Sequence, residues 1–293
     1  MQHGLIASMA DSKAPRACGI CGDVRKLSRA HVPPQAAGND SRVQRAPDRV
    51  VNQVREPGRW VEGGMWVRGL CQDCNSRSGG LYDAAYSDFS GQVERASSPL
   101  ARRLAVIQGE APDARLAPGA VARCVLYGMF ALNSRLRVRY PQLARDLLEE
   151  EYRLRPNIRW PQDLSLKLGL CDPRMRHMGL AAGSVWALRV LGAPQWHGSF
   201  ADIVWWPLTW SLVPAQGSVS SLAGRLPITE DLPDVSEWLF YGPDRTNVDL
   251  RNVVRRLPAM SHPLLNGSDD WLELYPDMEA EHPAVIVFGR RPC

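Results

Sequence analysis

Two cysteine pairs with the same CxxC spacing constrain the fold of this chain more than any other feature. The first pair is Cys18 and Cys21, and the second is Cys71 and Cys74. Zinc takes four thiolates at about 2.3 Å, and each CxxC turn presents two of them from one tight knuckle. Gly22 follows the first pair and is free to take the positive φ that such turns often use. We therefore predict that the four cysteines hold one structural zinc ion.

The remaining cysteines and the hydropathy pattern bear on the compartment. The chain has seven cysteines, and in a reducing compartment two CxxC pairs favour a metal over disulfides. We interpret Cys124 and Cys171 as buried thiols and Cys293 as a terminal residue without a partner. No apolar run approaches the ~20 residues that a membrane span needs. Because the N-terminus also lacks the pattern of a signal peptide, we expect a cytoplasmic protein that does not associate with membranes.

Composition divides the 293 residues into three segments. Residues 1–16 are small and polar, and we expect a flexible arm. Residues 17–110 begin with a stretch rich in Gly, Pro, Arg and Cys, which needs a staple to fold. They continue into a helical pattern over about 81–107, which Ser97-Ser98-Pro99 should break and which restarts over 100–107. Residues 111–293 are expected to form an α+β domain whose role the sequence does not indicate.

The periodic patterns of the last segment predict helices first and strands afterwards. Helices are predicted over 118–136 and 141–154, with a further short one over 250–257. The predicted strands cover 184–191, 201–213 and 284–289. The fold class that follows is α+β, with a zinc-stapled N-terminal module, a helical connector and a C-terminal domain built on a mainly antiparallel sheet.

The tryptophans of the second predicted strand allow two interpretations. Trp205, Trp206 and Trp210 form the largest aromatic cluster of the chain. Aromatic side chains can stack on unpaired bases. Alternate residues on a strand more often fill a core, so we favour a core role.

The residues around the cysteine pairs resemble the HNH, or ββα-metal, endonucleases. Between the pairs lies Ser28-Arg29-Ala30-His31-Val32-Pro33, and the string Arg68-Gly69-Leu70-Cys71-x-x-Cys74-Asn75 contains the second pair. In this family a histidine on the first strand precedes an aliphatic residue and often a proline, and an asparagine after the second CxxC starts the helix. The second string is especially similar to the zinc-bearing recombination endonuclease VII branch. The resemblance covers about residues 17–90 and implies a ββα-metal module there.

The resemblance also implies roles for individual residues. His31 would be the general base that takes a proton from water. Asn75 would bind a divalent metal, or orient His31, through its side-chain carbonyl. The metal would be Mg²⁺, Mn²⁺ or a second Zn²⁺, holding the scissile phosphate. Arg29, Arg68 and Arg77 are near these positions in the sequence and could clamp the phosphate.

One position departs from the family pattern. Most active members carry an acidic or histidine ligand directly before the histidine, where this chain has Ala30. Asp83 lies eight residues after Asn75, roughly where many members carry their last histidine ligand. On a regular α-helix these two residues would point to different sides, so both can face one metal only if Gly79-Gly80 opens the helix or starts it late. Asp88 is a weaker substitute.

Each candidate residue also has a purely structural interpretation. His31 could be a packed histidine at a strand end. Asn75 could cap the following helix. Asp83 could be an exposed acid that the helix dipole favours in a first turn.

The sequence therefore predicts a metal-dependent endonuclease for which DNA is favoured over RNA as the substrate and RNA stays open. Phage defence or a mobile element is its setting by analogy. The net charge of +4 and the preference for arginine over lysine permit nucleic-acid binding, although a GC-rich genome would give the same bias. One alternative is an inactive zinc-stabilised module that binds nucleic acid. Another is a structural protein that binds a protein partner, or itself, through the C-terminal domain.

Overall fold

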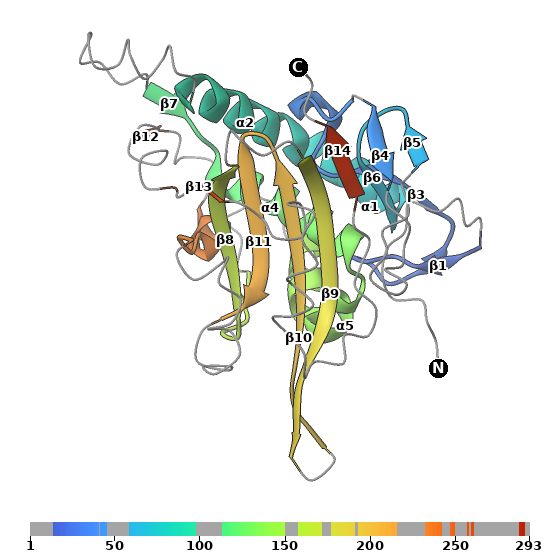
Figure 1. Ribbon diagram of the computed structural model, residues 1–293. Coiled ribbons are helices and arrows are strands. Elements are labelled where there is room, and N and C mark those ends of the chain that lie inside the picture. The colour runs from blue at the N-terminus through green and yellow to red at the C-terminus, as the bar shows by residue number, and fades with distance from the viewer. Residues whose placement is uncertain are drawn as a thin grey trace.

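Helices and antiparallel sheets make up the chain, as the α+β class predicts (Figure 1). The computed structural model describes residues 14–40, 42–45, 59–97, 113–149, 158–171, 177–190, 193–215, 232–241, 247–249, 257, 259–260 and 287–290. The predicted boundary between residues 110 and 111, most of the predicted arm and Cys293 lie outside these residues. Within the described ranges, no helix combines the length and the apolar character needed to cross a membrane.

The largest sheet has eight strands, and all its neighbouring pairs are antiparallel except the first. Its strand order is β13 (Ala259–Met260), β8 (Leu164–Cys171), β11 (Leu208–Pro214), β10 (Ala193–Trp205), β9 (His177–Val190), β14 (Val287–Arg290), β4 (Val43–Arg45) and β5 (Arg59–Val61). Strands β4 and β5 come from the predicted zinc module, and β14 comes from the end of the chain. The sheet therefore joins segments that the sequence analysis assigned to separate domains.

One predicted strand is wrong in its extent. The range 201–213 was expected to be continuous, but β10 ends at Trp205 and β11 begins at Leu208. The turn between them contains Pro207, which has no N–H to donate to a ladder and therefore fits a turn better than the middle of a strand. The described part of the strand predicted over 184–191 lies in the longer β9, and β14 contains the described part of the strand predicted over 284–289.

The helices lie mainly against one face of this sheet. Figure 1 shows α4 (Pro118–Leu132) and α5 (Arg135–Arg139) behind strands β8, β11, β10 and β9. The helix predicted over 118–136 is interrupted between α4 and α5, because the backbone of Asn133 is extended. α6 (Pro141–Glu149) is the described part of the helix predicted over 141–154, and of the helix predicted over 250–257 only the last residue is described. Two short 3₁₀ helices are η1 (Gln35–Ala37) and η5 (Ser236–Phe240).

A second helical segment begins at the second cysteine pair. α1 (Gln72–Ser78) continues through the π-helical turn η2 (Gly79–Asp83) into α2 (Ala84–Ser97). The helix expected from residue 81 thus starts nine residues earlier, inside the CxxC turn. Because α1 begins at Gln72, it follows β6 directly.

Three two-stranded antiparallel sheets make up the other strand pairs of the described residues. They are β1 (Arg16–Ala17) with β2 (Val24–Arg25), β3 (Leu27–His31) with β6 (Trp66–Cys71), and β7 (Asp113–Arg115) with β12 (Asn247–Asp249). β3, β6 and α1 follow one another as strand, strand and helix, with η1, β4 and β5 inserted between the two strands.

A single cluster of buried side chains connects the cysteine region to the large sheet. Trp210 on β11 is fully buried and makes edge-to-face contacts with the rings of Phe89 and Trp238, and Trp205 on β10 is also buried. The predicted core role is therefore confirmed for these two tryptophans, whereas Trp206 lies in the turn and is half-buried. On the other side, a Cβ on Gly69 would lie 1.7 Å from the carbonyl oxygen of Ala131. Strand β6 therefore packs directly on the last turn of α4, and only glycine fits there.

Candidate functional site

The four cysteines of the two CxxC pairs meet at one point. Cys18 and Cys21 come from the turn after β1, Cys71 ends β6, and Cys74 lies in the first turn of α1. Their sulfur atoms all lie within 4.8 Å of one another, and the Sγ atoms of Cys21 and Cys71 are 3.8 Å apart. A tetrahedron with bonds of about 2.3 Å from metal to sulfur has edges of about 3.8 Å. The predicted cluster is therefore confirmed as a set that could hold one metal ion, and four sulfurs suit Zn²⁺.

Backbone groups orient the first knuckle toward the second. The N–H of Cys71 donates to the Sγ of Cys18 at 3.3 Å. Gly22 takes a φ of +82°, as expected, and its N–H donates to the carbonyl of Cys18 at 3.0 Å. The pKa of Cys18 is lowered to about 4, first because the thiol of Cys74 donates to it. A lowered pKa favours the thiolate, which is the form that binds metals.

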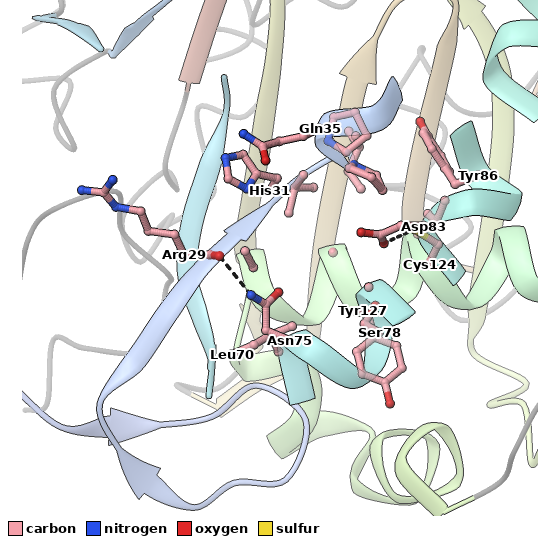
Figure 2. Close-up of a pocket in the computed structure, with 18 residues that line it drawn as sticks. Arg29, His31, Gln35, Leu70, Asn75, Ser78, Asp83, Tyr86, Cys124 and Tyr127 are labelled. Carbon is pink, nitrogen blue, oxygen red and sulfur yellow. Dashed lines mark hydrogen bonds between the residues drawn. The ribbon is translucent and has the colours of Figure 1, made fainter. Parts of the chain in front are cut away.

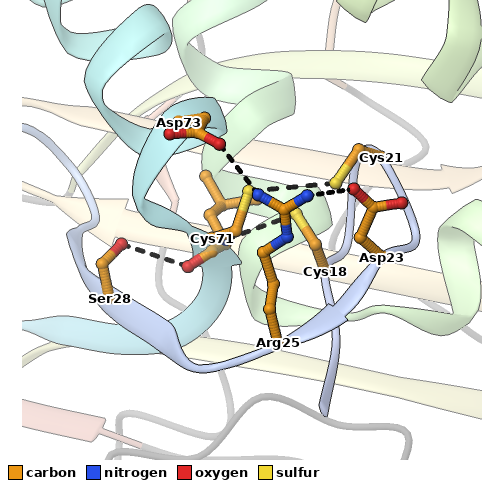
Figure 3. A network of polar contacts seen from close by, with 8 residues as sticks. Cys18, Cys21, Asp23, Arg25, Ser28, Cys71 and Asp73 are labelled. Carbon is orange, nitrogen blue, oxygen red and sulfur yellow. Dashed lines mark hydrogen bonds and ion pairs between the residues drawn. The ribbon is translucent and has the colours of Figure 1, made fainter. Parts of the chain in front are cut away.

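Arg25 links the two knuckles from outside (Figure 3). Its Nη1 donates to Asp73 on α1 at 2.8 Å, and its Nη2 donates to Asp23 beside the first knuckle. These ion pairs are exposed, so each contributes little to stability. The guanidinium lies next to the thiolates and would partly offset the negative charge of a metal ion bound by four sulfurs.

A cavity of about 210 Å³ lies on the other side of α1. It is enclosed by β3 and the residues after it, α1, η2, the start of α2, α4 and β10 (Figure 2). Its polar lining includes His31, Asn75, Asp83 and Cys124, whereas Val125 and other apolar side chains form much of the remaining wall. The three residues predicted to be catalytic thus line one cavity, although they come from three different elements.

The π-helical turn explains how Asn75 and Asp83 reach the same cavity. In an α-helix, eight residues rotate about 80° past two full turns. The extra residue of a π-helical turn reduces that difference to about 20°. The turn begins at Gly79-Gly80, where the sequence analysis required the helix to open. The carboxylate of Asp83 folds back over Gly79, so a Cβ at that position would lie 3.3 Å from Oδ2.

The two residues nevertheless lie at different heights along the helix. Eight residues rise about 12 Å in an α-helix, more than two short side chains can close around one ion. Among the described residues, only the cysteine cluster brings three or more metal-binding groups of His, Cys, Asp or Glu within 4.8 Å of one another. A cation at Asp83 would therefore be held by this carboxylate and by water, which is the coordination that Mg²⁺ favours.

His31 is fixed in one tautomer by the backbone. Its Nε2 lies 3.0 Å from the carbonyl oxygen of Gly63, and because a carbonyl only accepts, Nε2 carries the proton. In the neutral ring Nδ1 is then the acceptor. Burial lowers the pKa of His31 below its ordinary value of 6.5, opposed by the hydrogen bond to Gly63 and by the charge of Asp83, and reinforced by Arg29. The imidazole is therefore a neutral base at neutral pH.

Asn75 holds the strand that carries His31. Its Nδ2 donates to the carbonyl of Arg29 at 3.0 Å (Figure 2). The pairing of β3 with β6 is irregular between Ser28 and Ala30, so this bond fixes a bulge two residues before His31. The interpretation of Asn75 as a helix cap is wrong, because Cys71 occupies the N-cap position and Asn75 lies inside α1.

Asp83 is half-buried at the cavity wall. Its Oδ1 accepts a hydrogen bond from the thiol of Cys124 at 3.6 Å. Burial raises the pKa of Asp83, while Cys124 and His31 act in the opposite direction. Asp83 is therefore not the exposed first-turn acid of the structural interpretation. Asp88 is exposed and bonded to Gln92, so it does not replace Asp83.

Of the three arginines predicted to clamp phosphate, Arg29 is among the residues that line the cavity. The guanidinium of Arg29 lies 4.4 Å from the ring centroid of Trp66 and extends away from Asn75 (Figure 2). That of Arg68 lies 5.6 Å from the same ring and donates to the carbonyl of Leu27 at 2.9 Å. Neither Arg68 nor Arg77 is among the described residues that line the cavity.

Two residues of the cavity had no signal in the sequence. Cys124 was expected to be a buried thiol, which is confirmed, but nothing in its spacing indicates that it contacts Asp83. Ile203 lines the cavity from β10, far from the cysteine pairs in sequence. Only the tertiary packing of α4 and the sheet places these two residues at the site.

In comparisons with known proteins, no family model, curated protein or solved structure gives a significant match to this chain.

Proposed function

We propose that this protein is a metal-dependent endonuclease of the HNH type that hydrolyses phosphodiester bonds in DNA. The observation that supports the proposal is the convergence of His31, Asn75 and Asp83 on one cavity next to the cysteine cluster. The cluster would hold a structural Zn²⁺ that fixes β6 and α1. Its loss would release α1, which carries Asn75, and β6, which pairs with the strand that carries His31.

In this proposal His31 is the general base. Its neutral Nδ1 takes a proton from the water that attacks the phosphorus, while the bond from Nε2 to Gly63 holds the ring. Asn75 positions the strand through Arg29 and thereby sets the direction of the imidazole.

Asp83 is the residue that would hold a divalent cation, Mg²⁺ or Mn²⁺. The fit rests on a half-buried carboxylate that faces a polar cavity and whose second oxygen lies over the small Gly79. When bound, such an ion supplies charge stabilisation to the phosphate and the leaving oxygen. Because one carboxylate alone binds Mg²⁺ weakly, the substrate phosphate would complete the coordination.

A nicking assay tests this function. The zinc-loaded protein is incubated with supercoiled plasmid and Mg²⁺ or Mn²⁺, and with an RNA of similar length in parallel. We expect metal-dependent nicking that His31→Ala reduces by about 10²- to 10⁴-fold, the usual contribution of a general base. Asp83→Asn should abolish the metal response, whereas Asp88→Asn, an exposed acid further along the same helix, should not.

The absence of a ligand atom at Ala30 favours one competing function. Ala30 lines the cavity and is buried, so the position used by most active family members supplies nothing here. A protein that has lost the reaction would bind DNA in a salt-dependent manner without nicking it under any metal. That result would support the inactive binding module instead of the enzyme.

A further inference from the structure

The thiol of Cys124 is the one polar contact to the carboxylate of Asp83 that reaches it from outside its own helix within the described part of the chain. Cys124 lies on α4, is 6 % exposed and lines the cavity. It donates to Oδ1, while Oδ2 lies over Gly79. The two oxygens of Asp83 therefore have different surroundings. Oδ1 accepts the bond from the thiol, and Oδ2 lies next to a glycine, which has no side chain.

Two close approaches at glycines fix the position of α4. Near the cysteines, a Cβ on Gly19 would lie 2.1 Å from the carbonyl oxygen of Phe130. Near the cavity, a Cβ on Gly128 would lie 3.0 Å from the side chain of Val32. α4 thus cannot shift away from β3 or the first knuckle without losing packing, and this rigidity keeps the thiol of Cys124 at Asp83.

We infer that Cys124 is a positioning residue that orients Asp83 for cation binding, an inference that rests on the proposed function. A carboxylate that is the main protein ligand of an ion must be held in one rotamer, because a freely rotating one loses affinity. The thiol satisfies Oδ1 and leaves Oδ2 outside that bond, next to Gly79 in the cavity wall. Ala30 supplies no metal ligand from the strand. Cys124, which lies outside the stretch that resembles HNH nucleases, would support the remaining ligand, Asp83.

Titration of Mn²⁺, followed by electron paramagnetic resonance, tests this role without requiring cleavage. The zinc-loaded full chain is compared with Cys124→Ala, Cys124→Ser and Asp83→Asn. We expect Cys124→Ala to weaken Mn²⁺ binding by about tenfold, as removal of an outer-sphere partner does. Cys124→Ser keeps a hydroxyl donor and should stay within about threefold of the unmodified protein, and Asp83→Asn should remove the site.

Cys171→Ala is the matched control. Cys171 is an equally buried thiol on β8 that donates to the carbonyl of Leu208. Its loss should leave Mn²⁺ affinity unchanged, and melting curves of all variants show that each is folded. Unchanged affinity in Cys124→Ala, equal loss in Cys171→Ala, or no recovery in Cys124→Ser overturns the role of Cys124. If the unmodified protein binds no more Mn²⁺ than its Asp83→Asn variant, also when a short DNA duplex is present, the proposed metal-dependent function fails as well.

Discussion

Substitution of Asn75 separates two roles that its amide group could have. As a ligand it would act through Oδ1, and an aspartate would preserve or strengthen cation binding. As a positioning residue it acts through Nδ2, which donates to the carbonyl of Arg29 at 3.0 Å, and an aspartate cannot make that bond. The height difference between Asn75 and Asp83 along the helix favours the second role.

The size of the effect follows from one neutral hydrogen bond near the surface. Such a bond contributes about 0.5–1.5 kcal/mol to the free energy of unfolding, and exposure to water favours the lower half of that range. A loss of about 1 kcal/mol lowers the melting temperature of a chain of this size by about 2–4 °C. The effect on cleavage should be larger, about 10- to 100-fold, because a displaced bulge moves His31 relative to the phosphate.

The assay compares Asn75→Ala, Asn75→Asp and Ser76→Ala by melting temperature and by single-turnover nicking. We expect both substitutions of Asn75 to lose activity alike. Ser76 is exposed, accepts a bond from Gln72 on the outside of the same helix and does not line the cavity, so its alanine variant should match the unmodified protein. Full activity in Asn75→Asp would refute the positioning role and restore the ligand role.

Three further predictions concern the base, the glycines and the cysteines. Because burial lowers the pKa of His31 below 6.5, the neutral base should persist as the pH falls through 6.5, and the nicking rate should decline only at lower pH; a rate already halved at pH 6.5 or above contradicts this. Gly79→Ala and Gly80→Ala should each raise the free energy of unfolding, measured in thermal melts, by about 0.5–1 kcal/mol, because alanine favours a helix over glycine. Only Gly79→Ala should weaken Mn²⁺ binding, because its Cβ meets Asp83; equal Mn²⁺ affinities of the two variants would show that the carboxylate does not rest on residue 79. Metal analysis should find one zinc per chain, and its removal by a strong chelator should expose β3, β6 and α1 to hydrogen exchange; unchanged protection would mean that the four thiols fold without metal.

The cysteine cluster could be predicted from sequence because its chemistry is local. Each CxxC turn presents two sulfurs whatever surrounds it, so the spacing of Cys18 with Cys21, and of Cys71 with Cys74, was sufficient. The common orientation of Asn75 and Asp83 could be stated only as a condition on the two glycines, because helical periodicity alone places these residues on different sides. The π-helical turn meets that condition.

Features that depend on tertiary packing could not be predicted in this way. Cys124 and Ile203 reach the cavity because α4 packs against β3 and β10 packs against α4, and no periodicity or spacing encodes that arrangement. The same holds for β14, which joins the end of the chain to β4. The turn at Pro207 was available in the sequence, since proline inside a predicted strand argues for a break.

The most direct test of the account is an anomalous difference map from crystals of the zinc-loaded protein soaked in Mn²⁺. The account predicts two separate peaks, zinc among the four cysteines and manganese at the carboxylate of Asp83, inside the cavity that His31 and Asn75 also line. A map with a peak at the cysteines and none at Asp83, at Mn²⁺ concentrations that support nicking, would contradict it.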